Sequence, residues 1–117
     1  MAVTYAQVRE WVLALPGGAE VMVEEWGHPT FRVGSKMFAS GAPDSPSMTV
    51  KASTEEQAEL IAAAPETYSV AAYVGRFGWV QVQLADVDPD ELRELVVEAW
   101  RRTAPKKLVK EYDAGTR

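Results

Sequence analysis

The chain has 117 residues, of which 47% are hydrophobic and 25% are charged, and its formal net charge at pH 7 is −5. This length suits a single domain, residues 1–117, and the composition excludes disordered and fibrous classes. The absence of Cys excludes disulfides and thiolate chemistry and favours the cytoplasm, and the lack of long apolar runs argues against membrane spans and secretion.

The first helix is predicted to begin at Thr4, where a capping-box pattern precedes apolar residues at helical spacing. Pro and Gly at residues 16–18 end this helix. A strand is predicted over residues 20–26, followed by a turn at residues 27–29, because Pro29 disfavours helical backbone at the residue before it.

A hairpin is predicted next, with strands at residues 30–33 and 36–39 joined by Gly34 and Ser35. Two-residue hairpin turns of this kind use Gly for its positive φ angle at the first central position, and they fix the register of the strands. The predicted opposite pairs are Val33–Lys36, Arg32–Met37 and Phe31–Phe38.

Residues 40–46, rich in Pro and Ser, are predicted to form an exposed loop before a strand at residues 47–52. A second helix is expected from Ser53, with Glu56 completing a capping box, until Pro65 ends it.

A second hairpin is predicted from strands at residues 70–74 and 79–84, joined by a four-residue loop at 75–78. Alternation along the second strand places side chains on opposite faces. Val80, Val82 and Leu84 are expected on the core face, and Trp79, Gln81 and Gln83 on the other.

Asp88 and Pro89 have the capping pattern of a third helix, whose apolar stripe is predicted to pack in the core. A short terminal helix is expected at residues 105–112. The order of elements predicts an α+β fold: a mainly antiparallel sheet with two hairpins, flanked by three to four helices. The core is expected to include Trp11, Phe31 and Leu95.

Charge is distributed unevenly among these segments. Residues 26–52 carry a net charge of +2 and residues 70–84 carry +1, whereas the segments of the three predicted helices are each negative. The predicted sheet is therefore basic in an acidic chain, which weakens the argument that the overall charge makes against nucleic acid as a partner.

The run from Trp26 to Ala39, together with Lys51, Gly78-Trp79-Val80 and Tyr73, resembles the central pattern of the MmcQ/YjbR family. The resemblance extends from residues 14–17 to the helix through Trp100. It implies a small α+β fold similar in shape to type III secretion chaperones. It also implies DNA binding through two hairpin "wings".

Candidate nucleic-acid-binding residues are the cations of the sheet region, Arg32, Lys36, Lys51 and Arg76, with Trp79 stacking on a base. In the alternative interpretation, these cations protect exposed strands from edge pairing and Trp79 packs under a helix or the tail. Two functional hypotheses follow: a DNA-binding protein of the double-wing type, or a non-enzymatic module that binds a protein partner through the sheet face around Trp79, with or without dimerisation.

No catalytic, metal or cofactor site is predicted. His28 is the only imidazole, and with no Cys it leaves a metal only carboxylates. Neither a dinucleotide-binding nor a P-loop motif occurs. His28 is expected to hydrogen-bond the backbone of the turn, and the chain is not expected to be an enzyme.

Overall fold

A computed structural model describes residues 3–72 and 74–115, in which six strands form one sheet with helices packed against it. The elements, in chain order, are α1 (Tyr5–Ala14), β1 (Gly18–Val23), β2 (His28–Val33), β3 (Lys36–Ser40), β4 (Ser47–Val50), α2 (Thr54–Ala63), β5 (Tyr68–Val70), the 3₁₀ turn η1 (Gly75–Phe77), β6 (Val80–Gln83), α3 (Pro89–Thr103) and α4 (Lys106–Gly115). The predicted α+β class is confirmed.

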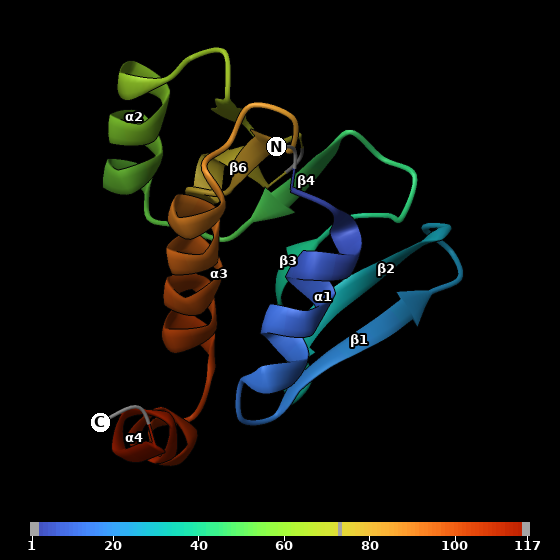
Figure 1. Cartoon of the computed structure of the whole chain (residues 1–117), viewed down its shortest axis with the longest axis vertical. Coiled ribbons are helices and arrows are strands. Elements are labelled where there is room, and N and C mark those ends of the chain that lie inside the picture. Colours follow the sequence, from blue (N-terminus) through green and yellow to red (C-terminus); the bar gives the residue numbers. More distant parts are fainter. Residues whose placement is uncertain (1–2, 73, 116–117) are drawn as a thin grey trace.

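The sheet has the strand order β1-β2-β3-β4-β6-β5, and every neighbouring pair is antiparallel. Helices α1 and α3 cover one face, and α2 packs beside β5 at one edge (Figure 1). Helix α4 lies below the end of α3. The strand order leaves β1 and β5 as the two edges, and the face opposite α1 and α3 is called here the open face.

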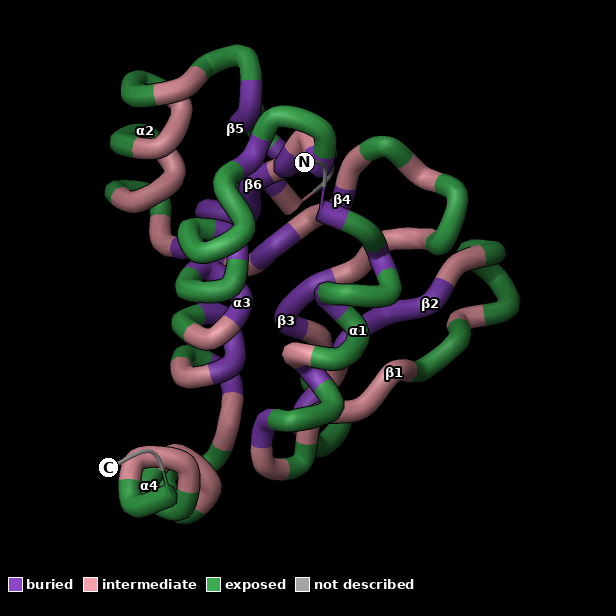
Figure 2. Tube along the Cα trace, in the orientation of Figure 1, coloured by how far each residue is buried: buried purple, intermediate pink, exposed green. Residues whose placement is uncertain are grey.

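The core lies between the sheet and helices α1 and α3, where buried segments of both layers face each other (Figure 2). Trp100 is fully buried, and its indole N–H donates to the Pro16 carbonyl oxygen at 3.0 Å. Phe31 and Leu95 are buried as predicted, whereas Trp11 is only partly buried at the margin of this core.

Capping residues fix where the helices begin. Thr4 forms the predicted capping box with Gln7 at the start of α1. The side chains of Ser53 and Asp88 accept the expected backbone hydrogen bonds at the starts of α2 and α3. The side chain of Glu56 lies 3.3 Å from Arg102 of α3, so it links two helices in place of closing a box.

The first hairpin is confirmed, with one change of register. Val33 pairs with Lys36 and Arg32 with Met37, but Phe31 pairs with Ala39 in place of Phe38. An irregularity between Phe31 and Arg32 admits one extra residue on β3. Both Phe38 and Ala39 are consequently buried, which alternation alone did not predict.

The predicted turn at residues 27–29 is wrong, because His28 and Pro29 belong to β2 and the turn covers residues 24–27. Gly27 provides the positive φ angle, +73°, that closes this turn. Pro29 fits in the strand because pairing of β2 with β3 begins only at Thr30.

The second hairpin exists, but its connection is longer than predicted. Tyr68 pairs with Val82 and Val70 with Val80, so the pairing precedes the predicted strand at residues 70–74. Residues 71–79 connect the strands through η1, and Tyr73 lies outside the described residues. Gly75 packs closely against β5, since a Cβ there would lie 2.2 Å from Val70 Cγ1 and would force that side chain to move.

Candidate functional site

Antiparallel pairing brings the predicted cations to one end of the sheet. The β2–β3 turn, the exit of β4 and the entry of β6 lie together there, because Val50 pairs with Val80 and Lys51 N–H bonds to the Phe38 carbonyl. Lys36 lies directly after the β2–β3 turn, Lys51 directly after β4, and Arg76 in the connection that leads into β6. This end of the molecule, with its neighbour Lys106, is called here the basic end.

Lys36 is exposed immediately after the tight turn of the first hairpin. Gly34 has a φ angle of +63° at the first central position, as the turn type predicted. An open hollow of about 440 Å³ separates this turn from the α3–α4 junction, and Lys36 and Lys106 both line it. The structure therefore places two lysines from distant parts of the sequence around one hollow.

Lys51 reaches the same region from β4. Its Nζ lies 3.4 Å from the Thr103 hydroxyl oxygen, and Thr103 also lines the hollow of Lys36 and Lys106. Lys51 is half-buried, so its ammonium group is held beside the end of α3. A cation at a helix C-terminus is favourable, because it complements the exposed carbonyl groups.

Arg32 lies on the open face and is held by the hairpin itself. Its Nε donates to the Thr30 hydroxyl oxygen at 2.9 Å, and its Nη1 donates to the Ser35 carbonyl at 3.0 Å. These contacts brace the β2–β3 turn. Arg32 is consequently a support of the turn that carries Lys36.

Arg76 and Trp79 have opposite environments, although they are close in sequence. Arg76 is exposed, with its guanidinium carbon 4.8 Å from the centre of the Phe77 ring. Trp79 is only 8% exposed, so its ring faces are not presented to a partner, as the packing interpretation predicted. Gln57 of α2 donates to the carbonyls of Gly75 and Trp79 at 2.7 Å each and fixes this connection.

The opposite end of the sheet is acidic. There the β1–β2 turn carries Glu24 and Glu25, and the β3–β4 loop carries Asp44. The segment from β6 into α3 adds Asp86, Asp88 and Asp90. Opposite charges are thus separated along the strand direction.

Tyr5, Arg9 and Glu20 form a polar cluster that ties α1 to β1. The Tyr5 hydroxyl donates to the Glu20 carboxylate, and Arg9 Nε lies 2.9 Å from the other carboxylate oxygen. The hydrogen bond from Tyr5, with that from Arg9, lowers the pKa of Glu20. Burial, and then Glu20, raises the pKa of Tyr5, which makes this phenol a weaker acid and unsuited to activation.

A second tyrosine–carboxylate pair joins β5 to α3, where the Tyr68 hydroxyl donates to Glu91. Burial, followed by the hydrogen bond to Glu91, raises the pKa of Tyr68 as well. Both tyrosines are therefore structural links between a strand and a helix.

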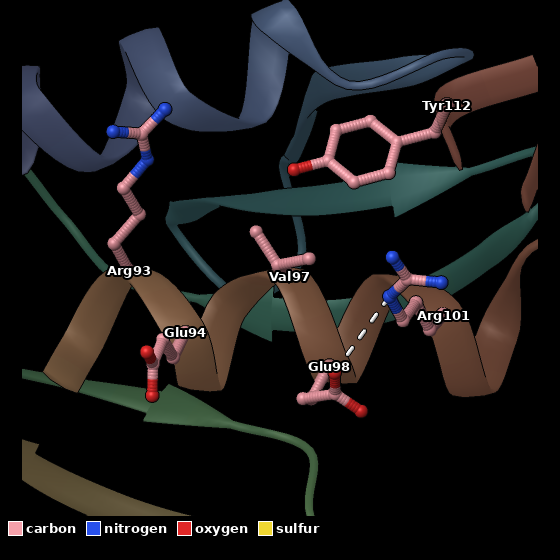
Figure 3. A pocket seen from close by; sticks show the side chains of 6 residues that line it. All are labelled: Arg93, Glu94, Val97, Glu98, Arg101 and Tyr112. Atoms are coloured by element: carbon pink, nitrogen blue, oxygen red, sulfur yellow. Dashed lines mark ion pairs between the residues drawn. The ribbon is translucent and has the colours of Figure 1, made fainter. Parts of the chain in front are cut away.

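A shallow hollow of about 350 Å³ lies between α3 and α4, and Figure 3 shows the side chains that line it. Two cations and two acids of α3 line this hollow, Arg93, Glu94, Glu98 and Arg101, and Arg101 Nε lies 3.6 Å from a Glu98 carboxylate oxygen. Arg101 also forms an ion pair with Asp113 of α4 at 2.5 Å. The Arg101–Asp113 pair links α4 to α3, and the mixed charges around the hollow present no single sign of charge to a ligand.

A wider groove of about 520 Å³ lies on the open face of the sheet. Within residues 3–72 and 74–115, its lining contains no Asp, Glu, Lys or Arg, and it includes His28, Met37 and Trp26, which is 54% exposed. His28 Nδ1 lies 3.0 Å from the Pro29 carbonyl oxygen, so its ring contacts the backbone as predicted, but the contact is with strand β2 and not with a turn. Among the described residues, no group of three His, Cys or acidic side chains is placed to hold a metal ion.

Two elements of this site have no counterpart in the sequence analysis. Lys106 joins the basic end because α4 folds back under α3, and its only signal was the basic run that follows Pro105. The exposure of Trp26 follows from the turn at residues 24–27, whereas the sequence favoured a strand there.

The fold and the segregated charges define a small α+β sheet protein with a basic end and a groove on its open face. In the described part of the chain, no helix is long and apolar enough to cross a membrane. A family model for YjbR matches residues 13–102, so the chain belongs to the YjbR family. YjbR is not a known enzyme family.

Relatives agree with this assignment. The chain is 30% identical to the uncharacterized proteins Rv2570 of Mycobacterium tuberculosis and Mb2600 of Mycobacterium bovis, over 97% of this chain and 98% of each relative. The crystal structure of Deinococcus radiodurans protein DR2400, a DUF419 domain, superimposes with a TM-score of 0.76 at 23% identity, covering 83% of this chain and 75% of that one. This structural likeness supports the fold.

Proposed function

We propose that this protein is a non-enzymatic, cytoplasmic DNA-binding protein that holds the phosphate backbone of duplex DNA at its basic end. The observation that carries the proposal is the convergence of Lys36, Lys51, Arg76 and Lys106 on one end of the sheet. Contacts with phosphates dominate non-specific affinity for DNA. Because the basic and acidic ends are opposite each other, the electric field of DNA would turn the basic end toward the duplex as the protein approaches.

The four cations have different parts in this proposal. Lys36 and Arg76 are exposed on the two hairpin connections and contact phosphates directly. Lys51, held by Thr103, adds fixed positive charge between them. Arg32 positions the turn of Lys36, and buried Trp79 contributes packing in place of base stacking.

The test is a titration of labelled duplex DNA at several salt concentrations, followed by fluorescence anisotropy. About four phosphate contacts give a slope near −3 to −4 in a plot of log affinity against log salt concentration. The double variant Lys36→Glu and Arg76→Glu changes residues 26–52 and 70–84 together from +3 to −1. We expect this variant to lose measurable binding while its thermal stability stays nearly unchanged, since exposed charges contribute little to folding.

A matched control distinguishes the effect of the basic end on DNA affinity from the effect of net charge. Lys36→Glu and Arg93→Glu change the net charge equally, but Arg93 is exposed on α3 near its acidic start. Binding should weaken strongly in the first variant and slightly in the second. Equal losses, or an affinity without salt dependence, would contradict binding at the basic end.

The open-face groove favours a second candidate, a module that binds an extended segment of a protein partner. Its aromatic and thioether lining at Trp26 and Met37 is of the kind that contributes strongly to protein interfaces. The sequence hypothesis placed this surface around Trp79, which the structure buries. Loss of a captured partner on Trp26→Ala, with no DNA binding by the unmodified chain, would favour this function.

A further inference from the structure

Strand β1 lies at an edge of the sheet. Its pairing with Pro29 of β2 shows which backbone groups of β1 point away from the sheet. Met22 pairs with Pro29, which has no N–H to donate, so this is a non-hydrogen-bonded pair in the ladder. Hydrogen-bonded and non-hydrogen-bonded pairs alternate along antiparallel strands. The N–H and C=O groups of Glu20 and Met22 therefore point away from β2, toward the free side of the sheet.

The side chains around this edge are apolar and exposed. Val21, Met22 and Trp26 are 40%, 60% and 54% exposed, and Leu13 of the neighbouring helix is 45% exposed. Natural edge strands are usually protected by Lys, Pro or an inward-directed charge. Residues 18–23 contain neither Lys nor Pro, and the carboxylate of Glu20 is engaged by Tyr5 and Arg9.

We propose that β1 pairs antiparallel with β1 of a second copy of this chain, around a two-fold axis at Val21, and joins the two sheets. In this register Glu20 exchanges backbone hydrogen bonds with Met22 of the second copy, and Val21 faces Val21 of the second copy. The outward groups of both strands are then satisfied. A register centred on Glu20 places two carboxylates opposite each other and is disfavoured.

The charges at the two ends of the sheet favour this partner. Antiparallel pairing places the start of β1, at the basic end, beside the end of β1 in the second copy. That end continues into Glu24 and Glu25. Each acidic turn therefore lies beside the basic end of the other copy, whereas parallel pairing would bring like charges together.

A single cysteine tests the register directly, because the chain has none of its own. Opposite residues of a non-hydrogen-bonded pair have Cα atoms about 4.5 Å apart, within the range of a disulfide. Val21→Cys should form a covalent dimer under mild oxidation. The control Val70→Cys, at a position 57% exposed on the other edge strand, should remain largely monomeric. Equal cross-linking of the two variants would overturn the proposed register.

Sedimentation equilibrium tests the association without cross-linking. The unmodified chain should sediment as a dimer of the 12.9 kDa protomer at high concentration and dissociate as salt is raised. Val21→Lys should weaken dimerisation by at least about tenfold, since it places two cations opposite each other. Val70→Lys should leave it unchanged. A monomeric unmodified chain, or a Val21→Lys variant that dimerises normally, would refute the proposal, whatever the result with DNA.

Discussion

Glu20 shows how a single carboxylate stabilises this fold. It lies on β1 and receives hydrogen bonds from Tyr5 and Arg9, both on α1. These hydrogen bonds stabilise the ionised form and lower the pKa of Glu20 in the folded protein. The unfolded chain offers no such partners, so protonation of Glu20 favours unfolding.

The pH dependence of stability should report this cluster. Because the folded pKa of Glu20 is depressed, its contribution is fully present above the unfolded pKa of about 4.5 and is lost as pH falls through the folded pKa. Tyr5→Phe removes the hydrogen bond that lowers this pKa most. We expect the free energy of unfolding, from urea titrations between pH 3 and 6, to decline less steeply in that variant. An unchanged slope would exclude Glu20 as a source of the acid sensitivity.

At the residue scale, the sequence predicted the chemical types in the site better than their accessibility. Lys36 and Arg76 are exposed, which agrees with their places on hairpin connections. Trp79 is buried because the 3₁₀ connection folds against the start of α2, a contact between segments far apart in sequence. No local pattern encodes such a contact.

At the element scale, the sequence predicted boundaries where a local device determines them. The caps at Thr4 and Asp88 and the turn at Gly34 are of this kind. The register change on β3 depends on packing of Phe38 and Ala39 in the core, so the alternating pattern did not predict it. The connection before β6 was predicted as a four-residue loop because its two glycines resemble turn residues, yet both also lie where a Cβ would approach neighbouring atoms too closely.

Gly78 and Gly34 provide a matched pair that tests this distinction. Both have positive φ angles, +98° and +63°, but a Cβ on Gly78 would lie 2.6 Å from the Ser53 carbonyl carbon, whereas Gly34 faces open space. Gly34→Ala should cost about 1 kcal/mol for backbone strain alone. Gly78→Ala should cost about 2–4 kcal/mol, because overpacking adds to the strain. Chemical denaturation measures both, and equal costs would contradict the close approach to α2.

At the scale of the whole molecule, positive and negative charges lie at opposite ends of the sheet. The sequence predicted a basic sheet and acidic helices from segment charges alone. The strand order adds what that analysis lacked, because it places the exits of β2, β4 and β5 at one end. Glu55, in the first turn of α2, is an acid within this basic end, since Gly78 contacts residues 52–54.

Glu55→Lys and Glu24→Lys should therefore affect DNA binding differently. Each variant raises the net charge from −5 to −3, and both positions are exposed. Glu55→Lys adds a cation to the basic end, so we expect about three- to tenfold tighter binding to duplex DNA at low salt and a steeper salt dependence. Glu24→Lys lies at the acidic end and should change affinity less than about twofold.

The Glu55→Lys variant should also lose about 0.3–1 kcal/mol of folding stability, because Lys in the first turn of α2 opposes the helix dipole. A thermal melt measures that loss separately from DNA affinity. Equal gains in affinity would show that DNA responds to net charge, and binding at the basic end would then be refuted.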